Sequence, residues 1–225
     1  MTKKSFYKFF DEVSSKLGVR QYSFSKIFNY LDNLPDPIII VETGCLRIKD
    51  NFSGDGQSTL LFDKYTQSRG KGSKVYTVDI NPTATKICSE IVSRDVSITT
   101  GDSVGYLNTL SNDFFDKKIE VSLFYLDSFD LEWRSPHQSC AHHLKELASI
   151  KKLLKKDTLV VVDDSPISGY LQQSKTNKKT LDPLPLGLVP GPTISGKGSL
   201  VHEYATQTGA RMLFSNYQTG WIGFN

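Results

Sequence analysis

Long apolar runs, paired cysteines and a strong excess of one charge are all missing from this sequence. Its longest apolar stretches are only as long as a β-strand, so we expect no membrane partner. The formal net charge is +3 and the lysines are scattered, which argues against a nucleic-acid partner. The amino terminus continues from Met1 into aromatic and charged residues, which is not the pattern of a secretory signal peptide.

The three cysteines, Cys45, Cys88 and Cys140, are isolated from one another and odd in number. No CxxC pair indicates a zinc site, and no even set indicates a disulfide framework. We therefore expect reduced thiols and a cytoplasmic location. Hydrophobic residues make up 38% and charged residues 23%, as in an ordinary globular protein, and the length suits one domain over residues 1–225.

From residue 38 onwards, strand-like and helix-like segments alternate. Continuous apolar runs such as residues 38–41 are typical of parallel strands that are covered on both faces. Strands are predicted at residues 38–41, 74–79, 96–99, 121–126 and 158–162, helices at residues 58–65, 82–93, 106–110, 143–154 and 200–208, and a terminal hairpin at residues 210–217 and 220–224. This alternation predicts an α/β fold, a Rossmann-like open parallel sheet with helices on both faces.

Two segments depart from this alternation. Residues 1–34 form an amino-terminal helical extension of two amphipathic helices, whose aromatic stripes favour core packing, although they could also pair across a homodimer. Residues 165–199 are rich in proline and glycine, and we interpret them as a lid or substrate loop. Within that loop, Lys197 lies between two glycines but lacks the spacing of a phosphate-binding loop, so we expect at most a contact with an acidic substrate.

Acidic side chains stand at or just after the end of every predicted parallel strand. The residues concerned are Glu42, Asp79, Asp102, Asp127 and the pair Asp163 and Asp164. Helix capping explains any single one of them, but it explains the whole set poorly. Because ligands of open α/β sheets bind beyond the carboxyl ends of the strands, we expect an acid-rich binding site there.

The residue types of this rim suit a nucleoside with a cationic group. An acid at the tip of the second strand, Asp79, can accept hydrogen bonds from a ribose diol. Asp102 could accept the adenine amino group, and Glu42 could lie near an ammonium group. A dinucleotide such as NAD would need a tight G-x-G-x-x-G turn, which the residues after Gly44 do not supply.

The run Val41 to Arg47 (VETGCLR), with the later Asp163 and Asp164, resembles the macrocin O-methyltransferase group within the class I S-adenosylmethionine-dependent methyltransferases. Asp127 with the same pair resembles the divalent-metal site of catechol-type O-methyltransferases. The resemblance implies a seven-stranded sheet with an antiparallel last strand, and S-adenosylmethionine as the cofactor. It implies cofactor contacts at Glu42, Thr43, Gly44, Gly54, Ser58, Asp79, Ile80, Asp102, Ser103 and Asp127, and Mg²⁺ ligands at Asp127, Asp163 and Asp164.

The catalytic residues implied are Asp127 and Asp163, while the general base is open. Catechol-type enzymes carry a lysine shortly after the first metal aspartate, where this chain has Asp130. His137, His142 and His143 follow the fourth strand where a base could lie, and His142 is our candidate. The metal has a rival interpretation, in which Asp163 and Asp164 belong to a turn and Asp127 only orients the substrate.

The expected substrate is a small-molecule acceptor, a hydroxyl of a sugar or glycoconjugate. Two alternatives stay open at this point: a catalytically inactive nucleotide-binding or partner-binding module of the same fold, and an NAD-dependent enzyme.

Overall fold

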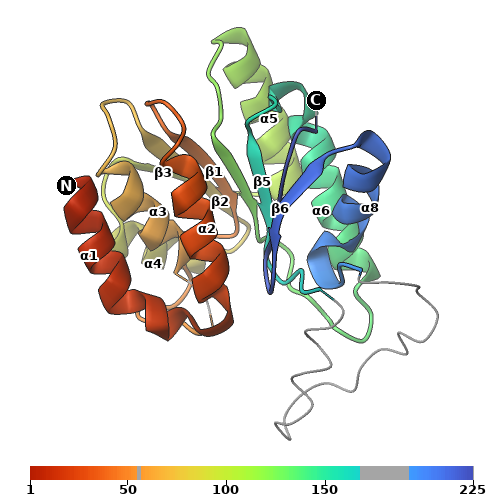
Figure 1. Ribbon diagram of the computed structural model, residues 1–225, viewed down its shortest axis with the longest axis horizontal. Helices are drawn as coiled ribbons and strands as arrows, with labels where there is room; N and C mark the ends of the chain where they lie inside the picture. The colour runs from red at the N-terminus through yellow and green to blue at the C-terminus, as the bar shows by residue number, and fades with distance from the viewer. Residues whose placement is uncertain (55–56, 168–192, 225) are drawn as a thin grey trace, which may run out of the picture.

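Seven strands form one sheet in the computed structural model, in the order β3-β2-β1-β4-β5-β7-β6 (Figure 1). The structure describes residues 1–54, 57–167 and 193–224. The strands are β1 (Ile39–Thr43), β2 (Lys74–Asp79), β3 (Val96–Thr100), β4 (Leu123–Leu126), β5 (Leu159–Val162), β6 (Arg211–Ser215) and β7 (Thr219–Ile222). Strands β1 to β5 pair in parallel, and β7 is antiparallel to both of its neighbours. The predicted seven-stranded sheet with an antiparallel last strand is confirmed.

Helices cover both faces of this sheet, as predicted, with α1 to α4 on one side and α5, α6 and α8 on the other (Figure 1). The α-helices are α1 (Lys3–Ser14), α2 (Gln21–Leu31), α3 (Ser58–Thr66), α4 (Pro82–Ile91), α5 (Ser103–Asp116), α6 (His137–Ile150) and α8 (Ser199–Thr208). The 3₁₀ helices in the described ranges are η1 (Ser15–Arg20), η2 (Lys151–Leu153) and η4 (Gly196–Gly198).

Strands β4 and β5 are apolar at every position because both of their faces are buried, whereas β1, which is buried as well, ends in Glu42 and Thr43. Alternate residues point to opposite faces, so Val161 packs in the core cluster beneath α1 to α3 while Val160 packs in the cluster beneath α5, α6 and α8. Tyr125 and Phe124 divide in the same way. The sheet thus lies between two cores, one on each of its faces.

The amino-terminal helices belong to the first of these cores. Phe6 lies edge-to-face against Phe28, with ring centroids 4.9 Å apart, and against Tyr65 of α3 at 5.1 Å. Tyr125 of β4 continues the aromatic contacts through Phe62 and Phe24. The aromatic stripes of residues 1–34 are therefore core contacts, and the homodimer stays a prediction.

Several helix boundaries differ from those predicted because polar first turns carry no apolar periodicity. Helix α5 begins at Ser103 rather than at residue 106, since the Asp102 side chain caps it by accepting from the Gly105 amide. Helix α6 begins at His137 rather than at residue 143. The predicted loop 165–199 lies outside the described residues between 168 and 192, and an isolated antiparallel bridge joins Ile167 to Ile194. None of the helices in the described ranges has the length and apolar character needed to cross a membrane.

Candidate functional site

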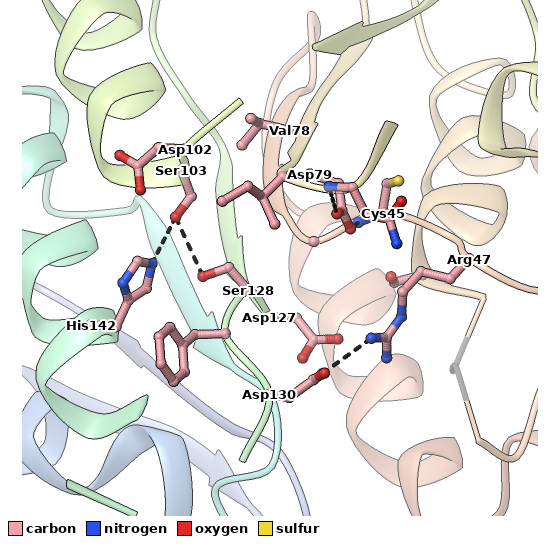
Figure 2. Close-up of a pocket in the computed structure, with 15 residues that line it drawn as sticks. Cys45, Arg47, Val78, Asp79, Asp102, Ser103, Asp127, Ser128, Asp130 and His142 are labelled. Carbon is pink, nitrogen blue, oxygen red and sulfur yellow. Dashed lines mark hydrogen bonds and ion pairs between the residues drawn. The ribbon is translucent and has the colours of Figure 1, made fainter. Parts of the chain in front are cut away.

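A cavity lies beyond the carboxyl ends of four adjacent strands, β3, β2, β1 and β4 (Figure 2). Three of the predicted strand-end acids, Asp79, Asp102 and Asp127, line it. The other described residues that line it are Gly44, Cys45, Arg47, Ser58, Val78, Ile80, Asn81, Ser103, Ser128, Phe129, Asp130 and His142. The structure therefore gathers side chains from separate parts of the chain into one acid-rich site, at the edge expected for an open α/β sheet.

Gly44 sets the floor of the cavity, where the chain leaves β1. Its φ is +77°, and a Cβ atom there would lie 2.4 Å from the Asp127 carbonyl oxygen. The Gly44 amide donates to the Val78 carbonyl (2.8 Å), so the turn is also tied to β2. Only glycine allows the ends of β1 and β4 to approach this closely.

The Asp79 carboxylate at the tip of β2 is held in a defined orientation. Oδ2 accepts from the Cys45 amide (3.1 Å) and Oδ1 accepts from the Asn81 amide (2.8 Å). Each carboxylate oxygen has two acceptor positions, so these bonds leave capacity for two further donors on the cavity side. This arrangement suits the paired hydroxyls of a ribose.

Asp102, Ser103 and His142 form another part of the cavity wall. The Ser103 hydroxyl lies 2.8 Å from His142 Nε2 (Figure 2). The His142 ring packs against Phe129, with ring centroids 5.2 Å apart. His142 Nε2 also lies 3.5 Å from the buried Glu146 carboxylate. His142 thus contacts Ser103 on α5 and Glu146 on α6. Its role as the general base stays a prediction.

Glu146 is fully buried yet ionised. Burial alone would raise the pKa of this carboxyl, but hydrogen bonds from His142 and neighbouring groups, with Ser128 among them, lower it to about 2. The Ser128 hydroxyl donates to Glu146 Oε1 at 2.5 Å. This carboxylate therefore anchors the wall that carries Ser128 and His142.

The Asp127 carboxylate meets a lysine at the end of β4. Lys197 Nζ lies 2.6 Å from Asp127 Oδ1 and 3.2 Å from Asp164 Oδ2. Arg20 donates through Nε to both Asp163 oxygens (2.9 and 3.1 Å) and through Nη2 to Asp164 (3.2 Å). Each of the three predicted metal ligands is thus in contact with a side-chain cation.

The pKa values in this cluster follow from burial and from mutual charge. Burial and the nearby Asp163 charge raise the pKa of Asp127 well above its usual value, with Lys197 opposing. Burial acts in the same direction on Asp164, but the Lys197 and Arg20 charges hold its pKa below the usual value. Burial would lower the pKa of Lys197, yet the charges of Asp127 and Asp164 raise it, so the ammonium group stays protonated.

Two side-chain cations contact the carboxylates that were predicted to bind magnesium. One oxygen from each of Asp127, Asp163 and Asp164 lies within 4.8 Å of the others, a spacing that a hard cation could bridge. The same carboxylates, however, already contact Lys197 and Arg20, both of which are buried. As these side chains stand, the donor set does not fit a metal ion without displacement of Lys197.

Some predicted cofactor contacts lie behind or beside the cavity rather than on its described lining. Glu42 is fully buried, and its Oε2 accepts from the Thr59 hydroxyl (2.6 Å), which in turn accepts from the Leu46 amide (3.0 Å). Thr43 is buried and accepts from the Asp127 amide, and the Gly54 amide donates to Asn51. Glu42 and Thr43 therefore support the loops that bear the site, and their contact with a cofactor stays a prediction.

Two basic residues of the site have partners that the sequence did not predict. Arg20 was not singled out, although a charged residue three positions after Leu17, on the apolar face of the helical extension, is a signal of a buried ion pair. Lys197 was expected to face an acidic substrate, but it is only 2% exposed and contacts this chain's own aspartates. The glycines on both sides of Lys197 were the available sequence signal that its backbone packs closely against other residues.

Because His143 is buried, we expect the protein to lose stability in acid. Burial lowers the pKa of His143 from its usual 6.5 to about 4. The unfolded chain therefore takes up a proton between pH 6.5 and 4 that the folded chain refuses, and the free energy of unfolding falls as the pH drops through this window. The shift corresponds to about 3 kcal/mol.

Denaturant unfolding of the wild type and of His143→Gln across this pH range measures the contribution. The variant is expected to be less stable at pH 7 but to lose about 3 kcal/mol less on acidification. His137→Gln, at an exposed position, is the matched control and should keep the wild-type slope. Equal slopes for wild type and His143→Gln would refute the assignment.

Comparison with known proteins finds solved structures of similar fold, but no family or curated protein that matches in sequence. No protein-family model matches the sequence, and no curated protein is similar enough in sequence to match. An O-methyltransferase from Bacillus cereus, solved in complex with SAH, is similar with a TM-score of 0.49 and 14% identity, covering 99% of this chain and 93% of that one. The N-methyltransferase NodS from Bradyrhizobium japonicum WM9 has a TM-score of 0.49 and 8% identity, covering 91% and 96%. Both are methyltransferases, the class that the sequence resembles, but neither likeness is close enough to carry a function across.

Proposed function

We propose that this chain is an S-adenosylmethionine-dependent methyltransferase that acts on a hydroxyl group of a small molecule such as a sugar or glycoconjugate. The observation that carries the proposal is the convergence of Asp79, Asp102 and Asp127, from three strand ends, on one cavity. Carboxylates on the wall favour a cationic sulfonium, and they disfavour the pyrophosphate of a dinucleotide.

The described lining residues divide the cavity into two ends. Asp79 would hold the ribose hydroxyls, while Asp102, Ser103 and His142 lie beside one another where the base would bind. Ile80, which is 75% exposed, offers an apolar surface for that base. Asp127 marks the other end, where the methyl group and the acceptor would meet.

When bound, S-adenosylmethionine supplies a methyl group on positively charged sulfur, which an oxygen nucleophile can take while the bonding electron pair returns to sulfur. We assign Asp127 to the acceptor hydroxyl, because its side chain is 22% exposed and lines the cavity, where the carboxylate can accept the proton that the hydroxyl loses. Lys197 fixes the orientation of Asp127 from the buried side. Correct alignment of the two reacting atoms supplies much of the remaining acceleration.

Cofactor binding is the direct test of this function. Isothermal titration calorimetry should show that S-adenosylmethionine and its demethylated product bind, whereas NAD should not. Asp79→Ala should weaken binding by about 1–3 kcal/mol through loss of the ribose contact. Asp116→Ala, an exposed change at the far end of α5, is the control and should bind like the wild type. No binding of either ligand to the wild type would end the proposal.

Transfer itself is tested with a panel of sugar and glycoconjugate acceptors, with methylated product detected by mass spectrometry. Product with an added methyl group on oxygen, lost in Asp127→Asn, supports the assignment. Binding of cofactor without transfer to any acceptor would favour the alternative of an inactive binding module of the same fold.

A further inference from the structure

The acidic cluster beside the cavity has its own positive charges. Lys197 Nζ contacts Asp127 and Asp164, and Arg20 contacts Asp163 and Asp164, all at 2.6–3.2 Å. The two cations come from opposite ends of the described chain, Arg20 from η1 and Lys197 from η4. Together they carry two positive charges among three carboxylates.

The Lys197 turn is built tightly against the end of β5. A Cβ atom at Gly196 would lie 2.0 Å from the Asp164 carbonyl oxygen, and one at Gly198 would lie 2.5 Å from the Ser165 hydroxyl. The Lys197 amide donates to the Asp164 carbonyl (3.0 Å), and Cys140 Sγ donates to the Gly196 carbonyl (3.0 Å). The backbone thus holds Lys197 on the cluster, and a side chain that is 2% exposed has no nearby solvent to turn into.

Arg20 is fixed to the same cluster from the helical extension. It is 7% exposed, and its guanidinium lies over the Tyr217 ring, 4.8 Å from the centroid. Its Nε reaches both oxygens of Asp163, a two-point contact that defines the orientation of that carboxylate. A magnesium ion drawn to these oxygens would lie against two cations that the fold already places there.

We propose that Lys197, supported by Arg20, takes the place of a divalent cation at this cluster, so that the protein does not bind Mg²⁺ there. A protonated lysine provides a fixed positive charge next to Asp127 without the need for a metal ion. This exclusion of metal rests on the contacts above alone. The corollary rests on the proposed function: methyl transfer proceeds without a divalent metal, with Lys197 as the positioning residue of Asp127.

Metal binding by the full chain tests the proposal without any acceptor. Mn²⁺, used as a paramagnetic substitute for Mg²⁺, is titrated into metal-free wild type, and bound ion is followed by electron paramagnetic resonance. We expect no saturable site in the wild type. Lys197→Ala should gain Mn²⁺ affinity by at least about tenfold, because it removes one positive charge beside the carboxylates.

Three variants give the measurement its specificity. Lys117→Ala, at an exposed lysine directly after α5, is the matched control and should gain nothing. Asp163→Asn added to Lys197→Ala should remove the gained site. Thermal unfolding checks that each variant is folded, and Lys197→Met, which keeps the apolar stem, replaces Lys197→Ala should the latter fail to fold.

A saturable Mn²⁺ site in the wild type that Asp163→Asn removes would overturn the proposal, and so would a folded Lys197 variant with no gain in affinity. Calorimetry with the demethylated cofactor in the presence of a chelator separates this result from the proposed function. Absence of cofactor binding there would end the methyltransferase assignment while the metal measurement still stands on its own.

Discussion

Replacement of Arg20 by methionine is expected to lower the free energy of unfolding by about 3–5 kcal/mol, because it leaves the buried Asp163 carboxylate without its ion-pair partner. Arg20 and Asp163 are both almost fully buried, with side-chain exposures of 8% and 2%. In the variant, the buried Asp163 carboxylate keeps its desolvation cost, and Lys197 is the nearby cation that still offsets it. Urea unfolding of the wild type and of the variant at neutral pH measures the loss.

A double-mutant cycle separates the ion pair from the lost packing of the long side chain. If Asp163→Asn is combined with Arg20→Met, the double variant should be destabilised by less than the sum of the two single changes. Arg134→Met, at an exposed arginine, should change stability by less than about 0.5 kcal/mol. Additive losses in the cycle would show that Arg20 acts through packing alone.

The second large effect is expected at Gly44, where a single added methyl group should damage both the fold and the site. A Cβ atom would lie 2.4 Å from the Asp127 carbonyl oxygen, in a backbone conformation with φ of +77°. Left-handed strain costs about 1–3 kcal/mol and overpacking adds a similar amount, so Gly44→Ala should lose about 2–5 kcal/mol of stability. Because the ends of β1 and β4 must then separate, the distance between Asp127 and the part of the cavity lined by Asp79 also changes.

Gly101→Ala is the matched control, since it follows β3 near the same cavity but has no atom within 4 Å of its added Cβ. It should fold with near wild-type stability and bind S-adenosylmethionine like the wild type. Gly44→Ala should lose most of its binding even where it remains folded. Wild-type affinity in a folded Gly44→Ala protein would show that the approach of the two strands is unimportant for the site.

The strands, though not their order in the sheet, were accessible from the amino-acid sequence for a simple reason. Strands buried on both faces are largely apolar, and runs such as residues 159–162 show this pattern within a short segment. Helix ends were less accessible: α6 begins six residues before its prediction, because its first turn is polar and its apolar face starts later.

The candidate site was accessible only in part. Strand-end acids could be predicted to share one edge, and Asp79, Asp102 and Asp127 do line one cavity. Glu42 follows the same rule in sequence, but it is fully buried and accepts a hydrogen bond from Thr59, so its contact with a cofactor stays a prediction. Position along a strand decides which edge a residue reaches, whereas the packing of the next loop decides whether its side chain faces the ligand.

The amino-acid sequence by itself determined the layered α/β architecture and the acidic rim, since both depend on residue patterns within short segments. Tertiary structure alone decided which charges meet that rim. Arg20 lies 143 positions from Asp163, and Lys197 lies 70 positions from Asp127. No local pattern encodes such pairs, because they form only when the folded chain excludes water from the carboxylates and leaves a buried side-chain cation as their partner.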